Sequence, residues 1–426
     1  MNEPDSGRSQ NLSRAHPARR MTGRDPQEQH RASTPLELLF DLTFTVAFGV
    51  AATQLGHGLA GNHIAAALTA FGFCVFAISW AWINFSWFAS AYDTDDWIYR
   101  LMTMVQMVGV IVLALGIPPV YASLSQGRHL DNQVMVAGYV VMRTAMVAQW
   151  LRAARQDPPR RATCLIYATT IFVAQIGWVV LIFAHLSVGA TAIWAAALLA
   201  IELLGPPAAE SRTSGTPWHA GHIAERYSLL TIIALGEGVI GTVASLSAVV
   251  SDQGWSTNAV MVAVAGTGLT FGMWWIYFVV PLADLLDAHR RQSSSFGYLH
   301  IGIFGAIVAT GAGLQAAALY IQHRSQLGSV GTVLRVALPV ALYIAVVNVL
   351  YSILARAWHS FHALVAVTTA AVLGAAVALA ALGVSMASCL LIVMLAPAVT
   401  VIGFELVGHR YAAQAITKRL GDDIDM

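Results

Sequence analysis

The sequence predicts an all-α fold, a polytopic bundle of about twelve transmembrane helices. Of its 426 residues, 57% are hydrophobic and only 11% are charged, whereas soluble globular proteins carry roughly 25% charged residues. The apolar residues gather in stretches long enough to cross roughly 30 Å of hydrocarbon, which takes about 20 residues each. In lipid each stretch must be a helix, because an open strand leaves backbone groups without hydrogen bonds.

The apolar stretches form two sets of six, and each set defines one half of the chain. The first set lies near 35–59, 63–91, 98–122, 133–152, 162–185 and 188–205. The second lies near 222–248, 256–281, 297–322, 331–354, 359–382 and 384–407. We therefore expect a first half over 35–205, a cytoplasmic linker over 206–221 and a second half over 222–407. Residues 1–34 are Arg-rich and polar, which predicts a disordered cytoplasmic arm, and 408–426 form a tail.

Basic residues predict the topology, because cytoplasmic loops are enriched in Lys and Arg. With the N-terminus inside, eighteen bases fall in cytoplasmic segments, and outer loops hold only Arg128 and Arg324. The remaining three, Arg143, Arg226 and Arg335, lie within helices or at their mouths. One mistaken span would reverse the later loops and remove this bias. The pattern therefore predicts an even number of helices with both termini in the cytoplasm.

The two halves also resemble each other. VAGYV from Val136 leads to LRAAR, and VALYI from Val340 leads to LARA. Glu37 and Glu225 each open a predicted helix and are followed five residues later by a Leu-Thr pair. These matches predict a parallel 6+6 internal repeat. In this alignment Glu237 corresponds to Gly49 and the carboxylates do not duplicate, which favours one asymmetric polar site.

Charged groups inside a membrane are functional candidates, since burying them unpaired costs several kcal/mol. Glu37 and Asp41 lie four residues apart and share one face at the start of the first helix. They are either a carboxylate pair at an entry path or, for Glu37 after Pro35, an acidic first turn that complements the helix dipole.

Glu237 lies near mid-bilayer, twelve residues or roughly 18 Å beyond Glu225. Gly236 and Gly238 flank it, and Gly241 follows one turn later. Glycines at mid-depth are typical of discontinuous helices that bind substrates or ions in transporters. They also occur where helices only pack closely, and Glu237 would then be a buried structural acid.

Arg143 lies ten residues into its predicted helix and needs an anionic neighbour, because arginine keeps its proton. Asp41 and Glu237 are the available partners, so we hypothesise a buried ion pair between the halves, with either a structural or a gating role. Gln106 either lines the same interior or bonds across helices. Substrate or ion binding is thus predicted at Asp41, Glu237 and Arg143, with contributions from Glu37, Glu225 and Gln106.

Asp93, Asp95 and Asp96 form an acidic loop before the third predicted helix. They are weak candidates for a divalent-cation site, because helix capping explains them more simply. Cys74, Cys164 and Cys389 all lie in apolar runs, where packed thiols are the simplest interpretation. Nothing in the motifs indicates a cofactor or a nucleic-acid partner.

Four motifs carry a resemblance to a known family: ELLFDLTFTVAF from Glu37, the DTDD loop leading to RLMTMVQMVGVIVLA, GYVVMRTAMVAQWLRAA from Gly138, and ERYSLLTIIALGEGVIG from Glu225. Together they resemble the bacterial low-temperature-requirement protein A family, from about Pro35 to the end of the last helix. The resemblance implies a multi-pass protein of the bacterial cytoplasmic membrane. The family name records a growth phenotype, so the resemblance implies no particular activity.

Three functions are compatible with these features. The leading hypothesis is a transporter or channel for a small ion or polar solute, not an enzyme. Its candidate partners are the lipid bilayer and a second copy of the chain. The second is a membrane-embedded, metal-dependent enzyme that acts on lipid through Asp93, Asp95 and Asp96. The third is a membrane sensor or assembly protein, in which interior charges would tolerate neutral replacement.

Overall fold

The structure is a computed structural model that describes residues 17–28, 31–127, 130–184, 186–212, 215–356 and 360–408. The helices of the first half are α1 (Pro35–Ala60), α2 (Ile64–Tyr92), α3 (Trp97–Leu115), α4 (Ile117–Gln126), α5 (Gln133–Gln156), α6 (Arg161–Phe183) and α7 (Val188–Arg212). Those of the second are α8 (Ala220–Gln253), α9 (Thr257–Phe278), α10 (Leu282–Ala288), α11 (Ser293–Ile321), α12 (Ser329–Leu354), α13 (Ser360–Ala381) and α14 (Met386–Gly403). Three short turns complete the fold, η1 (Pro158–Arg160), η2 (Arg290–Gln292) and η3 (Phe404–Gly408).

Within the described ranges, 12 segments are long and apolar enough to cross a membrane. Two of these segments contain a break. Helices α3 and α4 form one span that is interrupted at Gly116, and α9 and α10 form another that is interrupted before Leu282. No strand occurs in these ranges. The predicted all-α polytopic bundle is therefore confirmed.

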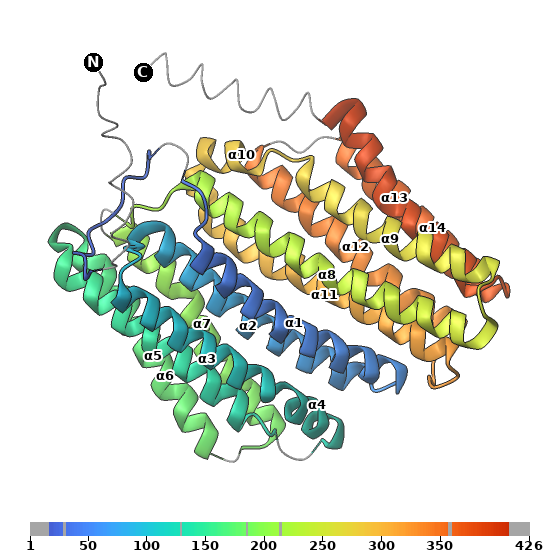
Figure 1. The fold of residues 1–426 in the computed structure, drawn as a ribbon, viewed down its shortest axis with the longest axis horizontal. Helices are drawn as coiled ribbons and strands as arrows, with labels where there is room; N and C mark the ends of the chain where they lie inside the picture. Colours follow the sequence, from blue (N-terminus) through green and yellow to red (C-terminus); the bar gives the residue numbers. More distant parts are fainter. Residues whose placement is uncertain are drawn as a thin grey trace, which may run out of the picture.

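Helices α1, α8 and α11 lie at the centre of the bundle (Figure 1). The span that contains α11 is the most enclosed, with 72% of an 18-residue apolar stretch buried against 28–56% of such stretches in the other spans. Helices α3, α5, α6 and α7 pack on one side of this centre, and α9, α12, α13 and α14 on the other. Large apolar side chains such as Val46 and Ile193 face outward, as the hydrocarbon of a bilayer requires.

Two glycines bring α8 and α11 into close contact. A Cβ atom on Gly241 would lie 2.6 Å from the carbonyl oxygen of Gly311. A Cβ atom on Gly311 would in turn lie 2.6 Å from the carbonyl oxygen of Glu237. Small residues permit this approach of two helix backbones. The close-packing interpretation therefore holds for Gly241, whereas a Cβ on Gly236 would meet nothing within 4 Å.

We call the end of the bundle at which α1 begins and α2 ends the arm end. The composition predicts disorder over residues 1–34, but the described parts of this segment, 17–28 and 31–34, lie across the arm end. Met21 is 0% exposed, and its N–H donates to Gln156 at 2.7 Å. The Arg31 guanidinium donates to the carbonyl oxygen of Ala89 at 2.7 Å. Residues 1–16 and 29–30, and the predicted tail beyond Gly408, lie outside the described residues.

Candidate functional site

Three charged side chains from α1 and α8 form a cluster at the arm end. Glu37, Asp41 and Arg226 are each 0% exposed. The Arg226 guanidinium donates to Asp41 Oδ1, and its Nη1 atom lies 2.9 Å from Glu37 Oε1. Trp82 of α2 donates from Nε1 to the same Asp41 oxygen at 2.7 Å. One buried guanidinium therefore compensates two buried carboxylates, as charges removed from water require.

The local sequence positions Glu37 for two roles. Thr34 is the N-cap of α1, its hydroxyl accepts from Glu37 N at 3.3 Å, and Glu37 Oε2 accepts from Thr34 N at 2.8 Å. This reciprocal capping box, followed by Pro35, fixes the start of the helix. The other carboxylate oxygen faces Arg226 and lies 3.2 Å from His222 Nε2. Glu37 is thus both the acidic first turn and a member of the buried pair.

Glu225 precedes Arg226 in α8, but its carboxylate binds a different part of the chain. Its Oε1 atom accepts a hydrogen bond from Ser33 N at 3.3 Å. Glu225 therefore helps to fasten the arm segment next to α1, and in the described contacts it does not join the cluster of Glu37, Asp41 and Arg226.

Glu237 lies where α1, α8 and α11 meet. Its side chain is buried, with the residue only 3% exposed. A Cβ atom on Gly49 of α1 would come within 2.9 Å of Glu237 Oε1, and Gly311 of α11 packs against its backbone and Cβ. In the described part of the chain, no hydrogen bond or ion pair includes its carboxyl group. Glu237 lies inside the helix where it was predicted. Its carboxyl group does not pair with Arg143, the partner that was expected.

Aromatic side chains fill the stretch between the arm-end cluster and Glu237. Along α1, Phe44 and Phe48 lie between Asp41 and Gly49, and both are at most 1% exposed. Phe304 of α11 is 0% exposed, with its ring centre 6.3 Å from that of Phe48 and 5.7 Å from that of Trp82. These aromatic side chains thus separate Glu237 from the buried acids Glu37 and Asp41.

The predicted pairing of Arg143 with Asp41 or Glu237 is wrong. Arg143 Nη2 donates to Glu202 of α7 at 2.9 Å, and both residues are 2% exposed. Tyr139 donates to the same Glu202 oxygen, and Trp178 donates to the other at 3.0 Å. All four residues belong to α5, α6 and α7. The pair therefore stabilises the first half and does not link the two halves.

Gln106 bonds across helices, which is one of the two roles the sequence allows. Its Nε2 atom donates to Gln149 of α5 at 2.9 Å, and it is 3% exposed. Because its contact joins α3 to α5, Gln106 belongs to the packing of the first half. It does not lie beside Glu237 in the described contacts.

The acidic loop before α3 is engaged in capping and ion pairs. Asp96 caps α3 by accepting from Tyr99 N at 2.8 Å, and it also accepts from Arg152 and from Arg19 N. Burial raises the pKa of Asp96, but these hydrogen bonds outweigh it and lower the pKa to about 2. Asp95 pairs with Arg100 at 2.8 Å.

Asp93 differs from Asp95 and Asp96, because no base is its direct partner in the described contacts. It is 7% exposed, and its Oδ1 accepts from Asp95 N at 2.8 Å. Burial raises the pKa of Asp93 to about 6, and the nearby Glu37 charge adds to the shift. No group of three or more metal-binding side chains occurs in the described residues. Of the three acids, Asp96 caps α3, whereas Asp93 accepts a hydrogen bond within the loop and Asp95 pairs with Arg100.

Arg226 and Glu202 are the two partners that sequence reasoning missed. Each is a charged residue inside an apolar helix, and such a residue requires a counter-charge. That requirement could have identified both residues as members of pairs. Which acid meets which base depends on how the helices are arranged, and the sequence pattern of a single helix does not contain this information.

Comparisons with known proteins agree with the resemblance stated above. The model of the family described as "Bacterial low temperature requirement A protein" matches residues 32–397. A similar protein is "Uncharacterized protein RA0937" of Rhizobium meliloti (strain 1021), 29% identical over 321 residues, which is 71% of this chain and 72% of that protein. No solved structure matches. The chain therefore belongs to the bacterial low temperature requirement A family of multi-pass membrane proteins.

Proposed function

We propose that this protein carries a small ion or polar solute across the membrane and that Glu237 binds it. The observation that supports the proposal is a carboxyl group deep in the bundle, at the meeting point of α1, α8 and α11, with no partner in the described residues. Ionisable groups at this depth commonly mark ion and proton pathways. A carboxylate suits a cation, including the proton.

A comparison within the same molecule argues against a purely structural role. Glu202 is a structural acid, because a guanidinium, a hydroxyl and an indole N–H all bind its two oxygens. Glu237 has no such set. Leaving a buried carboxylate uncompensated costs several kcal/mol, so Glu237 carries a cost that packing alone does not explain.

The proposal gives the other predicted site residues distinct roles. Glu37 and Asp41 lie at the arm end of the same three-helix centre and form the entrance of the path. Phe44, Phe48 and Phe304 close the path between this entrance and Glu237 in the present conformation. Movement of these rings would open it, whereas Arg143 braces the first half and takes no part in binding.

Flux through proteoliposomes tests the proposal. Purified protein is reconstituted into vesicles that contain a dye for pH, for Na⁺ or for K⁺, and a gradient of the matching cation is applied to each. One of these cations is expected to move through the parent protein. The Glu237→Gln variant removes the charge and keeps the shape, so the flux should fall by at least about tenfold, which corresponds to roughly 1.4 kcal/mol.

Gly236→Ala is the matched control, because it changes the neighbouring residue on the same helix and its Cβ would meet nothing within 4 Å. Its flux should equal that of the parent. Gly49→Ala should reduce the flux, since the added Cβ would lie 2.9 Å from Glu237 Oε1. Flux that is equal in the parent and in Glu237→Gln would falsify the assignment.

A further inference from the structure

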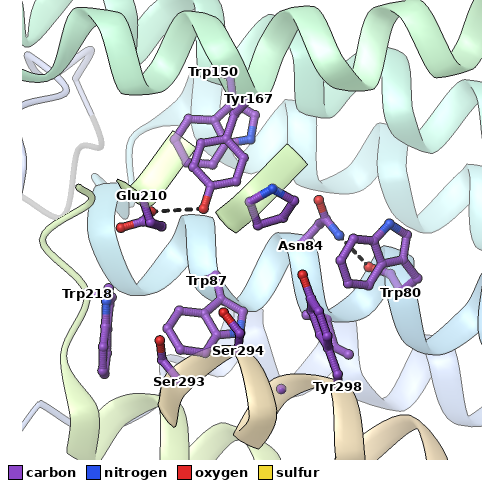
Figure 2. Close-up of a pocket in the computed structure, with 13 residues that line it drawn as sticks. Trp80, Asn84, Trp87, Trp150, Tyr167, Glu210, Trp218, Ser293, Ser294 and Tyr298 are labelled. Atoms are coloured by element: carbon purple, nitrogen blue, oxygen red, sulfur yellow. Dashed lines mark hydrogen bonds between the residues drawn. The ribbon is translucent and has the colours of Figure 1, made fainter. Parts of the chain in front are cut away.

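A second feature of the arm end is a pocket that lies apart from α1 and α8. It has a volume of about 60 Å³, which is room for roughly four water molecules. Figure 2 shows its walls, which come from α2, α5, α6, α7, α11 and the segment before α8. Six aromatic residues line it: Trp80, Trp87, Trp150, Tyr167, Trp218 and Tyr298.

These six rings form three pairs, each of which joins different parts of the chain. Trp150 of α5 stacks on Tyr167 of α6 with ring centres 4.3 Å apart. Trp87 meets Trp218 edge to face at 4.9 Å, and Trp80 meets Tyr298 edge to face at 5.5 Å. Such pairs restrict the rings. The pocket is therefore walled by aromatic groups that are held in place before any ligand arrives.

One acid, Glu210 of α7, also lines the pocket. Its carboxylate accepts from Tyr167 at 2.9 Å, from Thr216 Oγ1 at 2.8 Å and from Thr216 N at 3.0 Å. These donors are all neutral. In the described residues no basic side chain forms an ion pair with Glu210. Its negative charge is thus fixed in place but not compensated by the protein.

Arg290 contacts a residue of the pocket wall but binds partners other than Glu210. Arg290 lies over the Trp218 ring at 4.3 Å and donates to the Trp218 carbonyl oxygen at 2.6 Å. Its Nη1 atom lies 3.5 Å from Asp287 Oδ1. The Arg290 guanidinium thus shows that Trp218, one ring of the pocket wall, binds a cation. The negative face of its indole ring attracts positive charge.

Glu210 also argues against an acyl chain as the occupant. A hydrocarbon chain in the pocket would remove water from this carboxylate and offer it no counter-charge, which costs free energy.

We propose that this pocket binds a small alkylammonium ion, with its charge facing Glu210 and its carbon groups against the aromatic rings. Aromatic walls with a nearby carboxylate recognise organic cations because the ring faces attract the charge and the apolar groups lose little hydration. The ammonium group could belong to a free amine or to the headgroup of a lipid, since the chemistry is the same. This binding is independent of the flux assigned to Glu237.

Calorimetric titration of the full chain in a non-ionic detergent tests the proposal, with tetramethylammonium chloride as the probe. Sodium chloride at the same ionic strength and tert-butanol, a neutral molecule of similar shape, are the reference titrants. We expect saturable binding of tetramethylammonium only. The Glu210→Gln variant should bind at least about tenfold more weakly, because it loses the one uncompensated charge of the pocket.

Two further variants separate binding from folding. Asp252→Asn removes an exposed acid near the far end of α8, away from the pocket, and should bind like the parent. Ser294→Phe fills the pocket lining without removing a bond to Glu210, so it should lose binding while keeping the thermal midpoint of the parent. Equal binding of tert-butanol, stronger binding of acetate, or unchanged affinity in Glu210→Gln would each overturn the proposal.

Nanodiscs then distinguish the two sources of the ammonium group. Weaker tetramethylammonium binding in phosphatidylethanolamine discs than in discs of an uncharged galactolipid would show competition by the lipid headgroup, because neither surface attracts the cation by a net charge. Equal affinity in both would identify a free amine as the ligand. Both results support an alkylammonium site, and absence of binding in both kinds of disc and in detergent would contradict it.

Discussion

Arg226 carries the charge balance of the arm-end cluster. It contacts both Glu37 and Asp41, and its guanidinium carbon also lies 5.6 Å from the centre of the Trp82 ring. All of these groups are buried, so water cannot replace the arginine if it is removed. At the residue scale, Arg226 is therefore the one side chain in the described contacts that reaches both acids, with Trp82 at Asp41 and His222 at Glu37 as further partners.

Replacement of Arg226 by Gln should strongly destabilise the protein. Two buried carboxylates would lose their counter-charge, and removing one partner of a buried pair typically costs about 3–5 kcal/mol. Thermal unfolding in detergent measures the effect, and Arg226→Lys should recover part of it. Arg100→Gln is the control, because Arg100 and Asp95 are 42% and 39% exposed and such pairs contribute about 0–1 kcal/mol. Equal midpoints for Arg226→Gln and Arg100→Gln would exclude a dry cluster.

Asp93 gives the protein a pH dependence of known sign. Its pKa rises from 3.8 to about 6 on burial, so the folded state binds this proton more tightly than the unfolded state does. The stability from Asp93 is therefore complete below about pH 4 and is lost as the pH rises through 6.

The Asp93→Asn variant should remove this loss, because an amide does not ionise and its oxygen can still accept the Asp95 N–H. We expect a higher unfolding midpoint than the parent at pH 7.5 and an equal midpoint near pH 4. Thermal unfolding of both proteins between pH 4 and 8 measures the difference. A difference that does not change with pH would contradict the raised pKa.

At the scale of elements, the glycines of α8 differ in the neighbours that they contact. Gly241 faces the backbone of α11, and Gly238 faces Thr270 of α9, where a Cβ would come within 2.6 Å of its hydroxyl oxygen. Gly236 faces open space. Three glycines that look alike in the sequence therefore differ in their tolerance of a side chain.

Gly311→Ala and Gly236→Ala should act in opposite directions. The added methyl group of Gly311→Ala would lie 2.6 Å from the Glu237 carbonyl oxygen, and overpacking of this kind costs about 1–3 kcal/mol. In Gly236→Ala the methyl group meets no atom, and alanine favours a helix by up to about 1 kcal/mol. Thermal midpoints should therefore fall for Gly311→Ala and stay equal or rise for Gly236→Ala. The reverse order would mean that α8 and α11 do not touch at Gly311.

At the scale of the whole molecule, the two halves meet through α1, α8 and α11 (Figure 1). Gly49 and Glu237, which the internal alignment makes equivalent, lie against each other. Equivalent residues of two related units meet in this way when they flank a two-fold axis. The 6+6 repeat nevertheless stays a prediction, because a single contact does not establish symmetry.

The direction of the bundle in the membrane follows from its charges. The arm end carries most of the described arginines, whereas Arg324 lies at the opposite end. The positive-inside rule then predicts that the arm end lies in the cytoplasm. We expect a green fluorescent protein fused after Met426 to fluoresce and an alkaline phosphatase fused there to be inactive. A phosphatase inserted at Ser325, between α11 and α12, should be active, and the opposite pattern would reverse the topology.

Several site residues could be predicted from sequence, and their partners could not. Glu237 was found because a glutamate amid an apolar run requires an explanation, and Asp41 for the same reason. Arg143 is predicted too, but the partners expected for it were Asp41 and Glu237, and Glu202 was missed. Residues that lie 59 positions apart, as Arg143 and Glu202 do, become neighbours only through the packing of α5 against α6 and of α6 against α7.

The aromatic pocket was also beyond sequence reasoning. Glu210 lies in the predicted linker over 206–221, and no motif in the sequence connects it with Trp80 or Trp87. Their common pocket exists because α2, α7 and α11 converge at the arm end. Convergence of this kind leaves no periodic pattern in any one segment.

The amino-acid order alone determined the twelve spans, the class of fold and the family. The hydrocarbon of the bilayer fixes the spans and the class of fold locally, because every apolar segment must satisfy its own backbone hydrogen bonds as a helix. The tertiary structure alone decided that Arg226 serves Glu37 and Asp41, that Arg143 serves Glu202, and that Glu237 has no described partner. Charge pairing acts over a few ångströms in space, and only the arrangement of the helices brings distant residues within that range.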